Sequence, residues 1–451
     1  MGSIDDWLAG ISAGDNSHCA ARTHIKRKRS YPLTPDSACE TTTNGMAHPD
    51  TPTKRQKRTA ENSDWDETPK ASLINAPASV SASSSPTKRS LSGRSSSSAS
   101  SSRRKIQALA VSEQGIIRRQ LSGLQTPGLP EAIKGPLRKI ISLQRGRQVL
   151  SSHCNKLDFG DLIRDFELSS DAFADPGNGG SELSPQDVER IAKKARRCFE
   201  RDHDESPWNA EVHQDLFETT IRGPKFAQVG QPQLVDFSIC TSARLIKEYL
   251  LSPAPDQRID FCFYIDAAAD GDYARKVDAI RQELPEKSIN QTSYGPHLPY
   301  PIFSVTETKR PGNYFDDAML QLAVFQAAQL KLLRSLLRKA FHRHVQPDQP
   351  PTIQNHPFLD PASQYVNDSL AQLGALHNIL IQGHQWHYTA ISPELQDAFG
   401  GPSQKAILWL PELIANTNTE LGIHQVSAFI QYMKDELAVQ YWVWFKKYIL
   451  D

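Results

Sequence analysis

The chain has 451 residues with 51 basic and 51 acidic side chains, so a formal net charge of zero gives no whole-chain argument for a polyanionic partner. Its six cysteines occur without CxxC spacing, which predicts neither a disulfide framework nor a zinc knuckle and fits a reducing compartment. An acidic start, MGSIDDWLAGIS, and the lack of a run of about 18 apolar residues argue against a signal peptide and a membrane span. We therefore expect a soluble intracellular protein.

Residues 1–104 are expected to form a disordered basic tail. From about residue 13 this stretch is rich in Ser, Thr, Pro and charge, and it holds too little apolar surface to offset the entropy of ordering. Two basic clusters, Lys26–Arg29 and Lys54–Arg58, have the composition that a nuclear import receptor or a nucleic acid would bind. We interpret them as import signals and expect the protein in the nucleus, although such runs also simply keep a tail in solution.

Residues 105–180 are predicted to be a helical lead-in followed by a linker. Short apolar pieces alternate there with prolines, and the stretch ends at the turn-forming run Pro176 to Gly180. The folded domain is expected over residues 181–451. It begins with a helix at Ser184-Pro185, where Ser is the cap and Pro opens the first turn, and a second helix is predicted from about Ser206 to Ile221.

Short segments rich in β-branched and aromatic residues follow, bounded by Pro, Gly or Asp, which is the pattern of strands. Three of them precede a long amphipathic helix, predicted from about Phe315 to Phe341. Three more strands and a closing helix complete the chain. The predicted strands are Gln233–Thr241, Arg258–Ile265, Ile302–Lys309, Asn378–Gln382, Trp386–Ile391 and Ala406–Leu410, and the closing helix is Gln425–Ile449. The order helix, three strands, helix and strand predicts an α/β domain.

The candidate chemistry lies on two of these strands. Residues two apart on a strand share a face, so Glu307 and Lys309 project to the same side with Cα atoms roughly 7 Å apart. Asp260 is an acid within an otherwise apolar run, and such an acid is costly to bury unless something cationic meets it. If the two strands are neighbours, Asp260 and Glu307 can converge on a divalent cation, and Mg²⁺ prefers such oxygen ligands.

Asp260 followed by Glu307-Thr308-Lys309 resembles the PD-(D/E)xK signature of the restriction-endonuclease-like superfamily, whose αβββαβ core has the predicted element order. Over nearly its full length, through SIDDW, WNxxVH, VDF, ETKRPG and a QLxxxQAAQ helix, the chain is similar to fungal proteins that contain a PD-(D/E)xK nuclease-like domain. The resemblance implies a restriction-endonuclease-like core with flanking helices, behind the disordered tail.

Carried over residue by residue, the superfamily pattern implies a site for Mg²⁺ or Mn²⁺. Its metal ligands would be the side chains of Asp260 and Glu307 and the carbonyl of Thr308. Lys309 would position or activate the attacking water. The activity implied is hydrolysis of nucleic acid phosphodiester bonds, with DNA as the expected substrate.

Two further residues match the pattern. Glu211 occupies the place of an additional helical acid, and Gln321 opens a segment similar to the QLxxY motif of the RecB-like branch, with Phe325 in place of Tyr. There are also two departures. No Pro precedes Asp260, and Glu307 follows it by 47 positions, so residues 267–301 are expected to be an insertion between strands.

Alternatives remain open for the surface and for the function. On the long helix, a basic face formed by Lys331, Arg334 and Arg338 could bind phosphates or be merely solvated. The main alternative function is an inactive nuclease-like fold that binds or regulates, and another is a scaffold that works through its phosphorylatable tail. The presence of Asp260, Glu307 and Lys309 favours catalysis. The lack of a strongly basic folded domain favours the binding module. The clustered histidines, His377, His384 and His387, are interpreted as structural.

Overall fold

The structure is a computed structural model that describes residues 96–177, 179–223, 233–252, 257–312, 315–345, 360–396 and 403–451. All of them belong to one compact unit, Thr87–Asp451. The predicted disorder of the tail as far as residue 95, and both basic clusters, lie outside the described residues. Within the described ranges, no helix has the length and apolar character needed to cross a bilayer.

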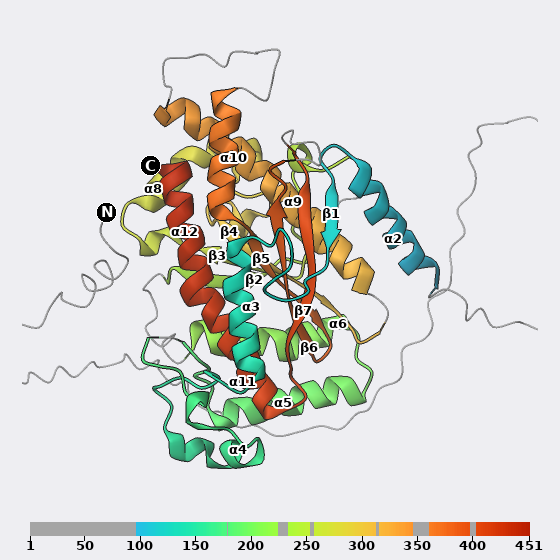
Figure 1. The fold of residues 1–451 in the computed structure, drawn as a ribbon, viewed down its shortest axis with the longest axis vertical. Coiled ribbons are helices and arrows are strands. Elements are labelled where there is room, and N and C mark those ends of the chain that lie inside the picture. Colours follow the sequence, from blue (N-terminus) through green and yellow to red (C-terminus); the bar gives the residue numbers. More distant parts are fainter. Residues whose placement is uncertain are drawn as a thin grey trace, which may run out of the picture. The chain divides into compact units, whose positions relative to one another are not determined.

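A mixed sheet of seven strands forms the centre of this unit (Figure 1). The strands are β1 Ile116–Arg119, β2 Val235–Ile239, β3 Phe261–Ile265, β4 Ile302–Lys309, β5 Leu376–Gln382, β6 Gln385–Pro393 and β7 Ala406–Asn416. Their spatial order is β1-β7-β6-β5-β4-β3-β2. The pairs β1–β7 and β4–β5 are parallel, and the other neighbours are antiparallel.

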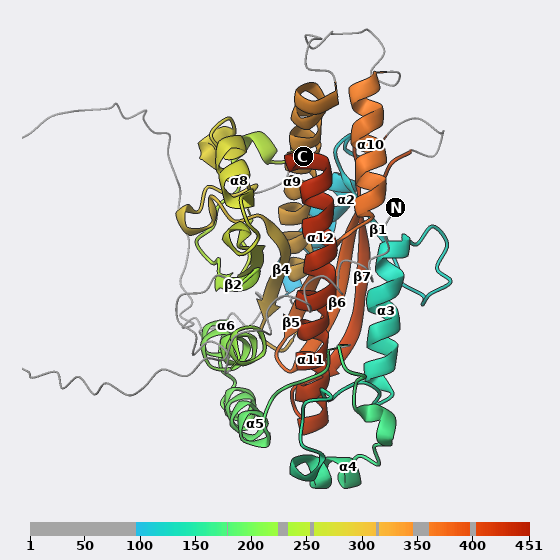
Figure 2. The ribbon, with the colours of Figure 1, turned by 90° about the vertical axis from the view of Figure 1, so that its left-hand side faces the viewer.

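Eleven α-helices are described around the sheet, some of them extended by 3-10 or π turns. They are α2 Ser96–Val111, α3 Glu131–Gln144, α4 Gly160–Asp165, α5 Pro185–Glu200, α6 Glu205–Trp208, α7 Gln214–Phe217, α8 Tyr273–Arg281, α9 Phe315–Ala340, α10 Pro361–Leu373, α11 Glu420–Tyr432 and α12 Ala438–Phe445. In Figure 2, α12 continues the line of α11. α6 and α7 belong to one helical segment, 205–222, which π turns complete.

The helices cover both faces of the sheet. Successive residues of a strand point to opposite faces, and β6 shows the consequence. His387 packs against Phe315 of α9, whereas the next residue, Tyr388, packs against Phe429 of α11 on the other face. The segment 205–222 lies on the α11 side, since its Phe217 contacts Trp386 of β6. The sheet is therefore buried between two helical layers.

The predicted core order is present. The helix starting at Pro185 is capped as expected, because the hydroxyl of Ser184 accepts from the N–H of Asp187 and the carboxylate of Asp187 accepts from the N–H of Ser184. Segment 205–222, strands β2, β3 and β4, helix α9 and strand β5 then follow in the predicted order. The expected insertion between β3 and β4 contains α8, and it leaves those two strands paired.

On the N-terminal side, the structure describes elements that precede the expected domain start at residue 181. Residues 96–104, predicted to be disordered, belong to α2, whose Ile106 and Leu109 are buried in the core. The expected lead-in and linker, 105–180, supplies edge strand β1, which pairs with β7, and helix α3, whose Ile133 and Ile140 are also core residues. The apolar segments in this part of the sequence are too short for any one of them to predict a helix or a strand. They become ordered by packing on elements that come much later in the chain.

We predict that Ile140→Ala in α3 lowers the free energy of unfolding by about 2–5 kcal/mol, because it removes a fully buried side chain from the shared core. The measurement is chemical denaturation of the full chain. As a control, Leu157→Ala should have little effect, because the side chain of Leu157 is 88% exposed. A separate early transition in the Ile140→Ala variant, with the main transition unchanged, would contradict the single core.

Candidate active site

Asp260 lies where strands β3 and β4 meet. As the sequence interpretation required, the two strands are neighbours, with Phe261 opposite Thr306. Asp260 immediately precedes β3, and its N–H donates to the carbonyl of Thr306 at 3.2 Å. Its carboxylate oxygen Oδ2 accepts two hydrogen bonds from Thr308, one from the backbone N–H and one from the hydroxyl, each 2.8 Å. These bonds fix the carboxylate of Asp260 against β4.

The ammonium group of Lys309 is surrounded by oxygen atoms. It donates to the carboxylate of Glu307 in a short contact and to the carbonyl of Thr308 at 2.9 Å. Oε2 of Glu205, in the first turn of α6, lies 3.4 Å from the same Nζ atom. The side chain of Glu307 is 1% exposed and that of Lys309 is 13% exposed, so solvent screens this ion pair weakly. Two of the three groups expected to bind a metal therefore already share one positive charge.

The acids of this cluster hold protons more tightly than free carboxyl groups do. Burial raises the pKa of Asp260, and burial together with the charge of Asp260 raises the pKa of Glu205 and, more strongly, that of Glu307. Burial alone would lower the pKa of Lys309, but Glu307, Glu205 and Asp260 together raise it. Three carboxyl groups thus face one ammonium, and a further cation would be stabilised there.

The oxygen atoms present fit a hard divalent cation. Oε2 of Glu307 is buried and has no hydrogen-bond partner among the described residues, and such an oxygen is costly to leave unpaired. Carboxylate and carbonyl oxygens are the ligands that Mg²⁺ and Mn²⁺ prefer. Within the described ranges, however, Asp260, Glu307 and Glu205 do not bring three oxygens within 4.8 Å of one another. A cation bound here would therefore share these oxygens with Lys309 or displace its ammonium.

Glu211, the predicted helical acid, does not join this cluster. Its carboxylate forms a short ion pair with Arg197 of α5, and Glu205 is the helical acid that reaches Lys309. Six helical positions correspond to a rotation of roughly 600°, which leaves the two acids on different faces. The sequence interpretation missed Glu205 because it placed the helix start at Ser206.

Gln321 supports the site from a distance. Its side-chain amide donates to the carbonyl of Arg258 at 3.4 Å, two residues before Asp260. This contact holds the chain that leads into β3. The side-chain hydrogen bond of Gln321 thus leads to the backbone before Asp260 and not to the carboxylates of the cluster.

The basic residues of α9 are largely used within the fold. Lys331 donates to the carbonyl of Leu250, and Arg334 donates to the carbonyl of Lys405. Both side chains are half-buried. Only Arg338 among the three is exposed, so these three side chains do not present a continuous basic face.

The clustered histidines have structural contacts, as expected. Nδ1 of His377 hydrogen-bonds to the hydroxyl of Tyr388 at 2.8 Å, and burial lowers the pKa of His377 to about 4. His384 contacts the hydroxyl of Thr417. The neutral His377 therefore acts as a core hydrogen-bonding group at neutral pH.

A groove of about 580 Å³ adjoins the end of β4. Gln382 lines it and is also the β5 partner of Lys309, but Asp260, Glu307 and Glu205 are not among the residues that line the groove. Its α5 wall carries Arg196 and Phe199, both exposed, and Gly312 forms part of the wall beyond β4. The groove thus carries a cationic, an aromatic and an acidic side chain, those of Arg196, Phe199 and Glu200.

A family model described as the PD-(D/E)XK nuclease superfamily matches residues 156–442. A search among curated proteins finds no match. The matched region covers well over half of the chain and includes strands β2 to β7, helix α9 and the cluster around Lys309. The predicted α/β fold with an αβββαβ core is thereby confirmed. The chain belongs to the PD-(D/E)XK nuclease superfamily.

Proposed function

We propose that this protein is a metal-dependent nuclease that hydrolyses phosphodiester bonds, with DNA as its main substrate. The observation that carries the proposal is the buried pair of Glu307 and Lys309 beside Asp260, at the meeting point of two neighbouring core strands. Superfamily membership supports nuclease chemistry at this position of the fold.

Each side chain of the site has a role that follows from its contacts. The carboxylates of Asp260 and Glu307 and the carbonyl of Thr308 would hold the divalent cation. When bound, Mg²⁺ or Mn²⁺ polarises the phosphoryl oxygen and lowers the pKa of the attacking water. The ammonium of Lys309 orients that water and balances the negative charge that develops on the phosphoryl group. Glu205 holds the ammonium in place through its contact with Nζ.

The groove beside β4 suggests how the substrate lies. Nucleic acid strands bind to protein by phosphate contacts with basic side chains and by stacking of bases on aromatic rings. Arg196 and Phe199 offer one group of each kind on the same wall. The phenyl ring of Phe199 is 57% exposed and packs on one side against His384, which leaves ring surface for a base. These features favour a strand with unstacked bases near the cleavage point.

A second candidate function is a nuclease-like module that binds nucleic acid without cleaving it. The close contact of Lys309 with Glu307 and Thr308 favours this candidate, since an ammonium held tightly there competes with a metal ion. Cleavage assays separate the two candidates directly.

Nuclear localisation is also part of the proposal. It is supported by the composition of the clusters Lys26–Arg29 and Lys54–Arg58, both outside the described residues. An import receptor is the proposed partner of these clusters.

We predict that the full-length protein cleaves labelled DNA in Mg²⁺ or Mn²⁺ but not in EDTA. Asp260→Asn, Glu307→Gln and Lys309→Ala should each lower kcat by about 100-fold or more, because cation binding and water alignment are both required. Circular dichroism and thermal melting check that each variant is folded. A labelled RNA substrate in the same assay tests the preference for DNA.

The two helical acids provide a matched control for this assay. Glu205→Gln should lower activity because it removes a charge that holds Lys309, whereas Glu211→Gln should leave activity near that of the unmodified protein because it faces Arg197. Equal losses in both variants would contradict the assignment of Glu205. Folded protein with metal bound and no cleavage of any DNA or RNA would support the binding module.

We predict that Mg²⁺ or Mn²⁺ stabilises the folded chain, by about 2.7 kcal/mol at a concentration 100 times the dissociation constant. Glu307→Gln should lose most of this stabilisation, and Lys309→Ala should retain or increase it, because the ammonium competes for the same oxygens. The effect should be larger at pH 8 than at pH 6, since raised pKa values let protons compete with the metal at the lower pH. The measurement is the melting temperature against metal concentration at both pH values.

In this metal titration, an equal loss of stabilisation in Lys309→Ala and Glu307→Gln would show that the ammonium helps to hold the cation. A metal-induced rise in melting temperature that is the same at both pH values would mean that the metal binds away from these acids.

We predict that Arg196→Ala and Phe199→Ala each raise KM for a single-stranded DNA substrate by about 10-fold, because base stacking on an aromatic ring is worth about 1–3 kcal/mol. The stabilisation by Mg²⁺ should not change in either variant. Lys193→Ala is the matched control, since Lys193 lies on the same helix but pairs with Glu189 and does not line the groove. An unchanged KM in both groove variants would place the strand elsewhere.

A further inference from the structure

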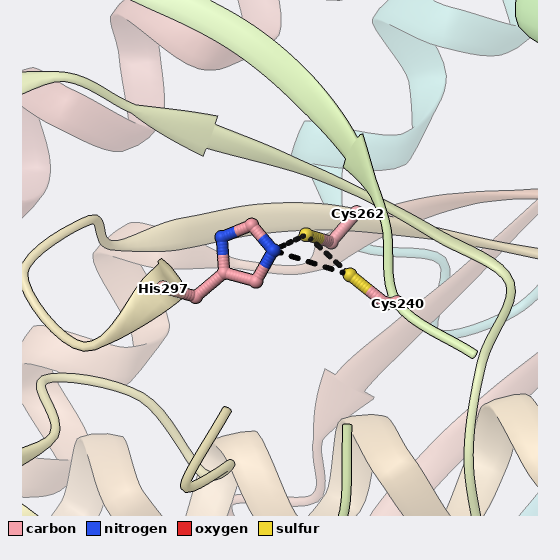
Figure 3. Close-up of side chains that lie close together, drawn as sticks. All are labelled: Cys240, Cys262 and His297. Atoms are coloured by element: carbon pink, nitrogen blue, oxygen red, sulfur yellow. Dashed lines mark hydrogen bonds between the residues drawn. The ribbon is translucent and has the colours of Figure 1, made fainter. Parts of the chain in front are cut away.

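A second cluster of metal-ligating side chains includes a residue of β3, the strand that Asp260 precedes. Cys240 directly follows β2, Cys262 lies in β3, and His297 comes from the insertion between β3 and β4. Among the described residues, these are the three ligand-bearing side chains whose Sγ, Sγ and Nε2 atoms all lie within 4.8 Å of one another. Figure 3 shows the imidazole pointing its Nε2 atom at both sulfur atoms. All three residues are buried.

The distances can be compared with those of a tetrahedral zinc site. Bonds of about 2.3 Å to sulfur and 2.0–2.1 Å to nitrogen give about 3.5 Å between sulfur and nitrogen and about 3.8 Å between two sulfurs. The two observed sulfur–nitrogen distances are 3.5 Å for Cys240 and 3.4 Å for Cys262. The sulfur–sulfur distance is 2.8 Å, so the thiols need to separate by about 1 Å. The Nε2 atom of His297 therefore already lies at the distance from both sulfur atoms that two ligands of one zinc ion would have.

Fixed elements hold the three side chains in place. The side chain of Asn290 donates to the carbonyls of His297 and Tyr300, at 2.6 and 2.8 Å, and accepts from the N–H of Ile302 at 2.9 Å. These bonds lock the loop that carries His297. Strand pairing sets Cys262 opposite Ser238. A site built on such rigid supports keeps its ligands together without large rearrangement.

The hydroxyl of Ser238 lies 2.8 Å from Nε2 of His297, and so an oxygen atom is available beside the cluster. Three protein ligands of the Cys₂His type leave one of four tetrahedral positions, which an oxygen ligand can fill. Thiolate and imidazole select zinc and do not suit Mg²⁺, which prefers oxygen. This cluster and the acidic cluster therefore suit different metals.

We propose that Cys240, Cys262 and His297 bind one zinc ion, with water or the hydroxyl of Ser238 as the fourth ligand. The ion ties the insertion 267–301 to the edge strands of the sheet. It also supports the active site, because the N–H of Cys240 donates to the carbonyl of Asp260 at 2.7 Å. A Cys240–Cys262 disulfide is the competing outcome, but it gives no role to an imidazole that faces both sulfurs.

The test starts from the full chain purified without chelators, with its zinc content measured by mass spectrometry. We expect one zinc per chain, and we expect Cys240→Ser, Cys262→Ser and His297→Ala each to lose most of it. Cys198→Ser, a buried thiol outside the cluster, and Asp260→Asn, in the acidic cluster, should both keep the zinc. Loss of zinc in Asp260→Asn but not in the cysteine variants would place the ion in the acidic cluster and overturn the proposal.

A second measurement needs no substitution and therefore does not depend on the folding of a variant. The unmodified chain, stripped of zinc, is titrated with Co²⁺. We expect the visible absorption of tetrahedral cobalt with thiolate ligands, saturating at one equivalent and lost when Zn²⁺ is added. Absence of bound zinc together with absence of this spectrum would overturn the proposal, as would a Cys240–Cys262 disulfide found by mass spectrometry in protein purified under reducing conditions.

Discussion

A carboxyl group whose side chain is 1% exposed is costly to ionise inside a protein sheet, and the ammonium of Lys309 lowers that cost for Glu307 from two positions along the same strand. This pairing holds the ammonium at the end of β4, where the carbonyl of Thr308 and the carboxylate of Glu205 complete its surroundings. Any cation that enters the site competes with the ammonium of Lys309 for the oxygen atoms of Glu307 and Thr308. In the proposed mechanism, metal binding and catalysis are therefore coupled through Lys309, which the chemistry needs near the metal and which charge repulsion keeps apart from it.

Most of the core could be predicted from the sequence, because strands β2 to β7 are rich in β-branched and aromatic residues. The alternation of side chains along a strand is enough to put Glu307 and Lys309 on one face. Strand β1 could not be predicted, because its four residues acquire their conformation from pairing with β7. Glu205 was missed because the helix was predicted to start one residue later, at Ser206, which left this acid outside the element. The Cys₂His cluster could not be found from spacing, because its ligands are separated by 22 and 35 positions and meet only through strand pairing and a folded insertion.

Asp260 is the residue at which the two clusters meet. Its side chain faces β4 through Thr308, while its carbonyl accepts from Cys240 at the end of β2. Cys262, two residues after Asp260, belongs to the cluster formed with Cys240 and His297. The strand start that presents the carboxylate is therefore held from both sides. The long insertion between β3 and β4 thus has a structural use, since it brings His297 to Cys240 and Cys262.

The parallel pairing of β1 with β7 also constrains how the chain is made. Ile116 lies opposite Ala406, so the two partners are separated by 290 positions. At roughly 5–20 residues per second, β1 leaves the ribosome about 15–60 s before its partner has been synthesised. During that interval the N-terminal segment has no edge to pair with, and its apolar residues are available to chaperones. Closure of the sheet is consequently among the last events of biosynthesis, and a chain that terminates early cannot accomplish it.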